Sequence, residues 1–367
     1  MRTVPTALAL VAALAAPASA LAVPTTRLLD APTAAPQLAL EPLGDGPGAF
    51  LVGSATPFQR WTTTDAGTTL TPLVLPAGTE SVSGDPHVGG VLWATVRTAE
   101  RTFSVQRSTD GGATWLPQAT VDGVDYAGVI GGGSLDRAFV RTDDEGAPGL
   151  RRVAGGAATP LAALDGEGLI AAAPSAPTTV YATSGEGRTA KLLRSTDGGA
   201  TFQERARVRP ASLCGGQVQG LDVDASAPGR LLLVACGRVL ESTDGGATLR
   251  VVRGLPADGT RTSRARRAPD GGIDVLASGA RGTVFGRLVG TTLGHRKDGI
   301  RSSAWNGTTL LADGPDALWR STDDGRTWSA LSGPLLPLVA GSVDGFATTR
   351  DGKLLGSGFG WLARVGA

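Results

Sequence analysis

The stretch RSTDGGATW, at residues 107–115, recurs three more times in this chain with one or two residues changed. Residues 194–202 read RSTDGGATF, residues 241–249 read ESTDGGATL, and residues 320–328 read RSTDDGRTW. Ser and Asp side chains accept hydrogen bonds from backbone N–H groups a few residues further on, and glycine adopts positive φ without a steric cost. The Thr and the aromatic residue that follow favour an extended strand. Because a catalytic motif is rarely needed four times, we interpret the repeat as a structural turn between two strands.

The spacing of this turn indicates a chain of similar units. Weaker copies lie at residues 63–70 and 151–159, and a further turn is expected at residues 289–291. With the Asp position as the mark, the first turns fall at 65, 110, 154, 197 and 244, a period of about 45 residues. Such a period is typical of repeats that cannot bury their own apolar face and therefore stack on their neighbours.

A second repeat lies inside the first. Each copy has a polar turn containing Pro or Ala, followed by an apolar strand, and we interpret it as the hairpin between the first two strands of a unit. Trp93, Tyr181 and Leu233 take the same place in this pattern, so we expect them in the core. The three copies are residues 84–95, 172–183 and 222–235.

These motifs resemble those of the Asp-box, or BNR, family of β-propellers. The family consensus S-x-D-x-G-x-T-W is matched at every fixed position by residues 108–115 and 321–328, while Phe202 and Leu249 replace the Trp in the other copies. The resemblance implies an all-β fold, a single propeller of four-stranded blades, with each box between the third and fourth strands on the face opposite the ligand site. The structural box residues are then Ser108, Asp110, Gly112, Trp115, Ser195, Asp197, Gly199, Phe202, Ser242, Asp244, Gly246, Ser321, Asp323, Gly325 and Trp328.

The two ends of the chain complement each other. Residues 24–30 predict a strand without a blade of its own, and residues 360–367 predict a last strand without a partner. Their pairing would close the ring and leave no free edge. Counting the units gives eight blades; seven is the alternative, because the last two expected turns are only 34 residues apart.

The first 20 residues have the pattern of a secretory signal, with Arg2, an apolar run over residues 7–16 and a small-residue site at residues 18–20. We expect cleavage after Ala20 or Ala22, one propeller domain over residues 23–367, and a secreted or periplasmic location. The apolar run is shorter than the roughly 20 residues that a membrane-spanning helix needs. With 34 basic and 33 acidic residues, the chain is not expected to bind nucleic acid. We expect a monomer without a cofactor.

We expect the function to be non-catalytic binding of a protein, peptide or glycan on the face opposite the boxes. In length and single-propeller build the chain is most similar to the photosystem II assembly factor type, whose members hold a membrane-protein precursor. Basic residues are frequent in the loops expected on this face in the later units. The candidate binding residues are Arg207, Arg209, Arg261, Arg264, Arg296 and Arg301.

The alternative is a glycoside hydrolase of the sialidase type, since the Asp-box family includes sialidases. The resemblance implies a tyrosine nucleophile, and with Tyr181 expected in the core, Tyr126 is the one candidate. The chain has two histidines, His87 and His295, which are too few for a convincing His-based zinc site or a Ser-His-Asp triad. No metal site is expected.

Cys214 and Cys236 flank one of the predicted first hairpins, whose turn lies at residues 225–229. In an antiparallel pair, opposite residues sum to a constant, so Cys214 should face a residue near 240, four beyond Cys236. One bulge would bring the two Cα atoms within the roughly 4.4 to 6.8 Å that a disulfide requires. We predict this disulfide for an oxidising compartment; two free thiols in the core of the sheet are the alternative.

Overall fold

The computed structural model describes residues 21–22, 25–30, 38–42, 50–55, 58–63, 71–85, 88–164, 168–173, 175–186, 189–208, 218–224, 226–235, 237–255, 261–268, 271–279, 282–300, 302–306, 309–314, 317–332, 343–348, 354–358 and 361–365. Several predictions from the sequence lie outside these residues. They concern the signal segment at residues 1–20, the turn at residues 64–70, Cys214, Cys236, Arg209 and Arg301.

The described residues form β-strands grouped into eight sheets, which we number I to VIII in chain order. Sheet I contains β3 (Leu38–Pro42), β4 (Phe50–Ala55), β5 (Phe58–Thr63) and β6 (Thr71–Pro72), and sheet II contains β7 (Thr79–Gly84), β8 (Leu92–Ala99), β9 (Thr102–Ser108) and β10 (Leu116–Asp122). Sheet III contains β11 (Tyr126–Ser134), β12 (Arg137–Asp144), β13 (Ala147–Ala154) and β14 (Ala157–Pro160), and sheet IV contains β15 (Ile170–Ala173), β16 (Ala176–Glu186), β17 (Thr189–Ser195) and β18 (Gln203–Val208).

Sheets V to VIII complete the series. Sheet V contains β19 (Val218–Val223), β20 (Leu231–Ala235), β21 (Arg238–Ser242) and β22 (Arg250–Val251), and sheet VI contains β23 (Arg261–Arg267), β24 (Ile273–Gly279), β25 (Gly282–Val289) and β26 (Thr292–Asp298). Sheet VII contains β27 (Ser302–Asn306), β28 (Thr309–Asp313), β29 (Leu318–Ser321) and β30 (Ser329–Ser332), with β1 (Leu21–Ala22) parallel to β30. Sheet VIII contains β31 (Val343–Thr348), β32 (Leu354–Gly358), β33 (Trp361–Val365) and β2 (Thr25–Asp30). Among the residues that the structure describes, none forms a helix that could span a lipid bilayer.

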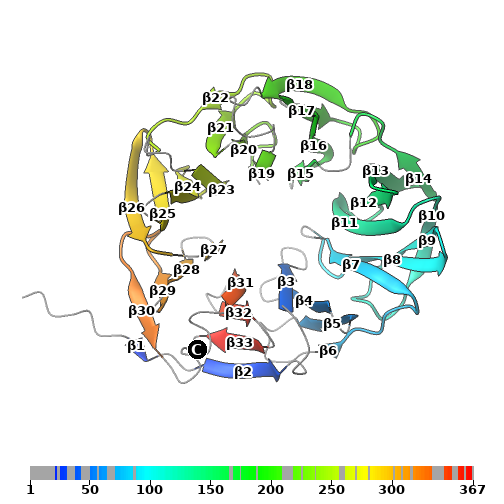
Figure 1. The fold of residues 1–367 in the computed structure, drawn as a ribbon, viewed down its shortest axis with the longest axis horizontal. Helices are drawn as coiled ribbons and strands as arrows, with labels where there is room; N and C mark the ends of the chain where they lie inside the picture. Colours follow the sequence, from blue (N-terminus) through cyan, green and yellow to red (C-terminus); the bar gives the residue numbers. More distant parts are fainter. Residues whose placement is uncertain are drawn as a thin grey trace, which may run out of the picture.

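The eight sheets lie around a common centre, with the first strand of each nearest the centre (Figure 1). Within each sheet, neighbouring strands of the meander are antiparallel. The connections from first to second strand and from third to fourth strand therefore lie at the same end of the sheet. We call this end the turn face and the opposite end the loop face.

In sheets II and V the second strand is the most deeply buried. All five residues of β20, Leu-Leu-Leu-Val-Ala, are buried. A strand that is covered on both faces by neighbouring sheets reads as a continuous apolar run rather than an alternating one. Trp93, Tyr181 and Leu233, in β8, β16 and β20, each have no exposed surface, which confirms that they belong to the core.

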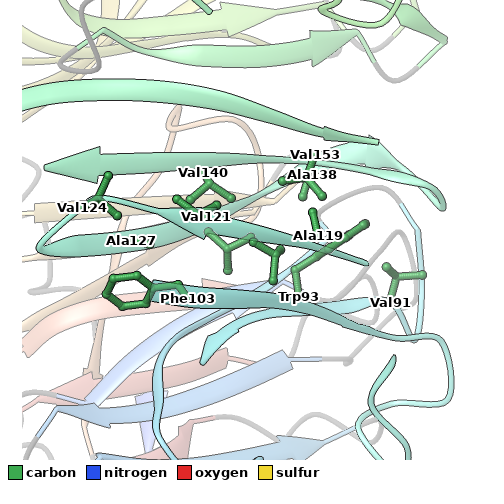
Figure 2. Packing of buried hydrophobic residues seen from close by; sticks show 12 residues of the cluster. Val91, Trp93, Phe103, Ala119, Val121, Val124, Ala127, Ala138, Val140 and Val153 are labelled. Carbon is green, nitrogen blue, oxygen red and sulfur yellow. The ribbon is translucent and has the colours of Figure 1, made fainter. Parts of the chain in front are cut away.

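The apolar core lies between successive sheets. Figure 2 shows the cluster between sheets II and III. Trp93 and Phe103 of sheet II pack with Ala127, Val140 and their neighbours in sheet III. Similar clusters join sheets III and IV, IV and V, V and VI, and VI and VII. Contacts of β27 with β31 and of β31 with β3 continue the series. Sheets III to VI thus bury both faces against the sheets on either side.

The two termini share one sheet. β2, from the N-terminal part of the chain, pairs antiparallel with β33, the last strand, from Thr25 opposite Val365 to Asp30 opposite Trp361. The predicted pairing of the terminal strands is confirmed. It leaves β2 as the outer strand of sheet VIII (Figure 1).

Candidate functional site

The four strong copies of the repeat, which we call the repeated turns, connect the third and fourth strands of sheets II, IV, V and VII. In the first of them the buried Ser108 hydroxyl donates to Asp110 Oδ1 at 2.7 Å and accepts from the Gly112 N–H at 2.7 Å. Asp110 accepts from the Thr114 N–H at 2.9 Å and from the Thr114 hydroxyl at 2.6 Å. The predicted self-contained turn is therefore present, with its side chains bonded to one another. The serine hydroxyl and the aspartate make equivalent bonds in the other three turns, at residues 195–201, 242–248 and 321–327.

These hydrogen bonds lower the pKa values of the turn aspartates. Side-chain and backbone donation from Thr327 lowers the pKa of Asp323 to about 2, and backbone and side-chain donation from Thr248 lowers that of Asp244 to about 2. The pKa of Asp110 is also lowered, chiefly by the Thr114 hydroxyl. The carboxylates act here as acceptors within their own turn, a structural role.

Each turn also touches the sheet that precedes it. A Cβ atom on Gly246 would lie 2.6 Å from Leu192 Cδ2, and one on Gly199 would lie 2.8 Å from the Phe139 ring. Both glycines have positive φ, at 86° and 82°, so close approach and backbone conformation both require glycine. The turns therefore couple neighbouring sheets.

The fourth turn differs because Asp324 stands where the other turns have their first glycine. Asp324 has a φ of 61°, and its Oδ1 lies 3.0 Å from Nη1 of Arg287 in the preceding sheet. The fully buried Arg287 also donates from Nε to Asp274 Oδ1 at 2.7 Å. Arg266, whose pKa burial lowers to about 10, donates to the same carboxylate. This buried network, which the sequence pattern did not indicate, joins sheets VI and VII.

Polar side chains also reach from one sheet to the first hairpin of the next. We call them the cross-sheet donors: Arg107, Arg137 and Tyr181. Tyr181 is both a core residue and a donor, which explains why this position is not simply aliphatic in sheet IV. The bonds run from Arg107 Nη1 to Leu135 O, from Arg137 Nη2 to Pro177 O and from Tyr181 Oη to Pro228 O, each 2.7 Å long.

Of the six expected binding arginines, the four that the structure describes lie on strands rather than in loops. Arg207, near the loop-face end of β18, pairs with Glu204, and Arg296, in β26, pairs with Asp298 at 2.7 Å. Arg264 is exposed on β23, the strand that Arg261 begins. β18 and β26 are outer strands and β23 is an inner strand, so these arginines do not form one cluster (Figure 1).

Tyr126 begins β11 at the loop-face end and is 47% exposed. Its hydroxyl lies over Gly128, so that a Cβ atom on this glycine would clash with Tyr126 Oη. Beside it, Asp125 is 3.3 Å from Nε of Arg101, which also pairs with Asp144. This arginine is engaged by carboxylates of the protein itself. Among the described residues, no group of three or more His, Cys, Asp or Glu side chains is arranged to hold a metal ion.

A cavity of about 680 Å³ lies between sheets V and VI at the turn face. Sheet VI has no repeated turn; its third and fourth strands are joined by Gly290 and Thr291 alone, as expected from the sequence. Glu241, Arg250 and Arg267 lie on the cavity wall with several apolar residues. This cavity was not predicted from the sequence. The one feature of the sequence that could have indicated this cavity is the absence of the repeated turn from the sixth unit.

No known family profile matches the sequence, and comparison with curated proteins found no similar sequence. The fold is similar to solved β-propellers. YCF48 bound to D1 peptide gives a TM-score of 0.54 at 14% identity, over 96% of this chain and 100% of that chain. YCF48 from Cyanidioschyzon merolae gives 0.53 at 14% identity, over 93% and 98%. An ancestral GH74 enzyme gives 0.54 at 12% identity, over 89% of this chain and 50% of that chain. Identities this low show the fold alone, which is propeller-like.

Proposed function

We propose that this chain is a closed eight-bladed Asp-box β-propeller that binds a protein, peptide or glycan and does not act on it as an enzyme. The contacts between successive sheets and the pairing of β2 with β33 support the closed ring. The repeated turns bond their side chains internally and pack on the preceding sheet. Ligand binding is therefore assigned to the rest of the surface, first of all to the loop face and the inner strands.

The observation that carries this proposal is the arginine content of β23. This strand, the inner one of sheet VI (Figure 1), reads RTSRARR. Arg264 at its middle is exposed. In the described part of the chain, Arg264 has no ion pair, whereas Arg97 and Arg101 near the loop face of sheet II are paired with carboxylates. An unpaired guanidinium offers a fixed fork of donors to a carboxylate or another anion. We therefore propose a partner with exposed negative charge, in keeping with the peptide held by the similar YCF48 fold.

Fluorescence anisotropy tests this proposal with a labelled peptide of alternating Glu and Ala, its Gln counterpart, and labelled polysialic acid. We expect an acidic probe to bind, with an affinity that falls as salt is added. The double variant Arg261→Ala, Arg264→Ala should lose this binding. Arg326→Ala, an exposed arginine in a repeated turn on the turn face, is the matched control and should retain it. Unchanged binding in the double variant, or no binding of any acidic probe, would contradict the proposal.

The same preparation separates binding from the hydrolase alternative. Sialosides and aryl glycosides are offered as substrates to the wild type and to Tyr126→Phe. We expect no turnover by either protein. Turnover by the wild type that Tyr126→Phe abolishes would assign the sialidase-type alternative instead.

We also propose that the protein is exported, with residues 1–20 or 1–22 removed. The support is the sequence pattern of the first 20 residues. Mass spectrometry of the protein expressed with its full N-terminus should give a chain that begins at Leu21 or Val23. A chain that retains residues 1–20 would contradict export by this route.

A further inference from the structure

The interface between sheets V and VI is open where the preceding interface is covered by a repeated turn. Between sheets IV and V, the turn at residues 242–249 lies on sheet IV, with Gly246 against Leu192 and the Gly245 carbonyl accepting from Arg205 Nε at 3.3 Å. Sheet VI offers only the two-residue turn Gly290 and Thr291 at the same place. Less of sheet V is therefore covered at the turn face.

The register identifies the surface that is left open. Ser195 and Ser242 occupy the same position in their repeated turns, so Arg205, ten residues after Ser195, corresponds to Val252 in sheet V. Arg205 contacts the turn of the next sheet, whereas Val252 lies on the wall of the cavity. At about 680 Å³, this cavity is within the range of roughly 300 to 1,000 Å³ that is typical of small-molecule sites.

The cavity combines an apolar wall with an excess of hydrogen-bond donors. Val252, Ile273 and Leu288 form the apolar part. Arg250 and Arg253 are exposed on the rim and, within the described part of the chain, neither has an ion pair or a side-chain hydrogen bond. Two cationic side chains beside an apolar wall fit an anion that carries an apolar group.

A third arginine lies deeper in the same wall. The side chain of Arg267 is 9% exposed, pairs with Glu241 and donates from Nη1 to the Gly271 carbonyl at 3.0 Å. Its buried Nε has no hydrogen-bond acceptor in the described structure. Two carboxylates pair with Arg267: Glu241 and, at 3.9 Å from its Nε, Asp224 Oδ2. Arg250 and Arg253 have no such partner in the described structure and give the rim of the cavity its positive charge.

We propose that this cavity is a binding site for a carboxylate joined to an apolar group. Arg250 and Arg253 bind the carboxylate, and Val252, Ile273 and Leu288 contact the apolar group. A guanidinium matches the two oxygens of a carboxylate, and the apolar wall disfavours a strongly hydrated anion such as phosphate. Either a free carboxylic acid or the C-terminal residue of a peptide presents this chemistry. The site lies at the turn face and does not depend on the proposed function of β23.

Isothermal titration calorimetry of the full chain tests the site with N-acetyl-leucine and N-acetyl-leucinamide. We expect the acid to bind at least about tenfold more tightly than the amide, because only the acid forms charge-assisted hydrogen bonds. The double variant Arg250→Gln, Arg253→Gln should bind the acid at least about tenfold more weakly than the wild type does. Arg326→Gln, an exposed arginine in the repeated turn of sheet VII, is the control and should bind as the wild type does.

A second pair of ligands separates the two sources of the carboxylate. A peptide ending in Ala-Leu with a free C-terminus is compared with its amidated form. Tighter binding of the free peptide than of N-acetyl-leucine assigns a peptide C-terminus, and equal or weaker binding assigns a free acid.

The proposal is overturned if acid and amide bind equally, if neither binds, or if inorganic phosphate displaces the acid at a lower concentration than the acid itself requires. It is also overturned if the double arginine variant binds the acid as tightly as the wild type. Val252→Trp, which fills the cavity, should abolish binding. If Val252→Trp does not fold, the double arginine variant alone tests the site. Arg250 and Arg253 are exposed, so their replacement should not disturb the packing of the core.

Discussion

Each repeated turn depends on one buried serine hydroxyl that both donates and accepts. In sheet IV, the Ser195 hydroxyl donates to Asp197 Oδ1 at 2.6 Å and accepts from the Gly199 N–H at 2.7 Å. Ser195 is 1% exposed, so water cannot easily replace these bonds. An alanine at this position would leave the Gly199 N–H buried without an acceptor.

Ser195→Ala should therefore lower the free energy of unfolding by about 1 to 3 kcal/mol, the cost of an unsatisfied buried donor. The matched control is Thr196→Ala, which removes an exposed hydroxyl from the next residue and should change stability by less than about 0.5 kcal/mol. Urea unfolding followed by tryptophan fluorescence measures both. Equal stability of the two variants would mean that the serine hydroxyl does not hold the turn.

The lowered pKa values of the turn aspartates should make the stability of the folded protein depend on pH. The pKa of Asp323 is lowered from 3.8 to about 2 in the folded protein, so folding favours its charged form. This contribution is complete above the unfolded pKa of about 3.8 and is lost as the pH falls from about 4 to about 2. Asp323→Asn should reduce the loss of stability over this range. Asp122→Asn, an exposed residue outside the turns, is the control; an unchanged pH profile for Asp323→Asn would contradict the assignment.

At the scale of elements, the cross-sheet donors fix each sheet against the first hairpin of the next. Tyr181 combines a buried ring in β16 with a hydroxyl that bonds to the Pro228 carbonyl between β19 and β20. The hydroxyl is separable from the packing, because phenylalanine keeps the ring. The hydrogen bond can therefore be tested without opening the core.

Tyr181→Phe should lower the free energy of unfolding by about 0.5 to 1.5 kcal/mol, the net value of a typical hydrogen bond. Tyr126→Phe is the control at the other tyrosine of the chain, which is 47% exposed, and should leave stability unchanged. Thermal and urea unfolding of both variants measure the difference. A larger loss for Tyr126→Phe than for Tyr181→Phe would contradict the placement of the two rings.

Much of the fold at this scale could be predicted from the sequence. Turn residues identified the hairpins, and the apolar runs identified Trp93, Tyr181 and Leu233 as core, because both signals are local. The positions of the arginines could not be predicted in the same way. Strand ends follow from pairing with neighbours, so Arg207 falls within β18 and Arg264 within β23 instead of in loops. The cavity between sheets V and VI arises from an absent turn, which only the packing of both sheets makes visible.

At the scale of the whole molecule, the predicted disulfide is a separate question. The last pair of β19 and β20 at the loop-face end is Val218 with Ala235, so Cys236 follows this pair directly in sequence and Cys214 precedes it by four residues. We expect the denatured, unreduced protein to contain no free thiol in Ellman's assay and two after reduction. Two free thiols before reduction would show that Cys214 and Cys236 are not bonded.

The arrangement of the whole chain depends on the pairing of β2 with β33. The sequence predicted this pairing because each terminal strand lacked a partner of its own, and the structure places them in one sheet. If the ring is closed as we propose, the terminal strands share the cooperative stability of the molecule. If it is open, they fray independently of the core.

Native-state hydrogen exchange followed by mass spectrometry tests this claim most directly. If the ring is closed, peptides covering Thr25–Asp30 and Trp361–Val365 should exchange through the same opening reaction, with the same dependence on urea, as peptides covering Leu231–Ala235 in the core. Exchange of the two terminal strands within seconds, while β20 remains protected, would contradict it.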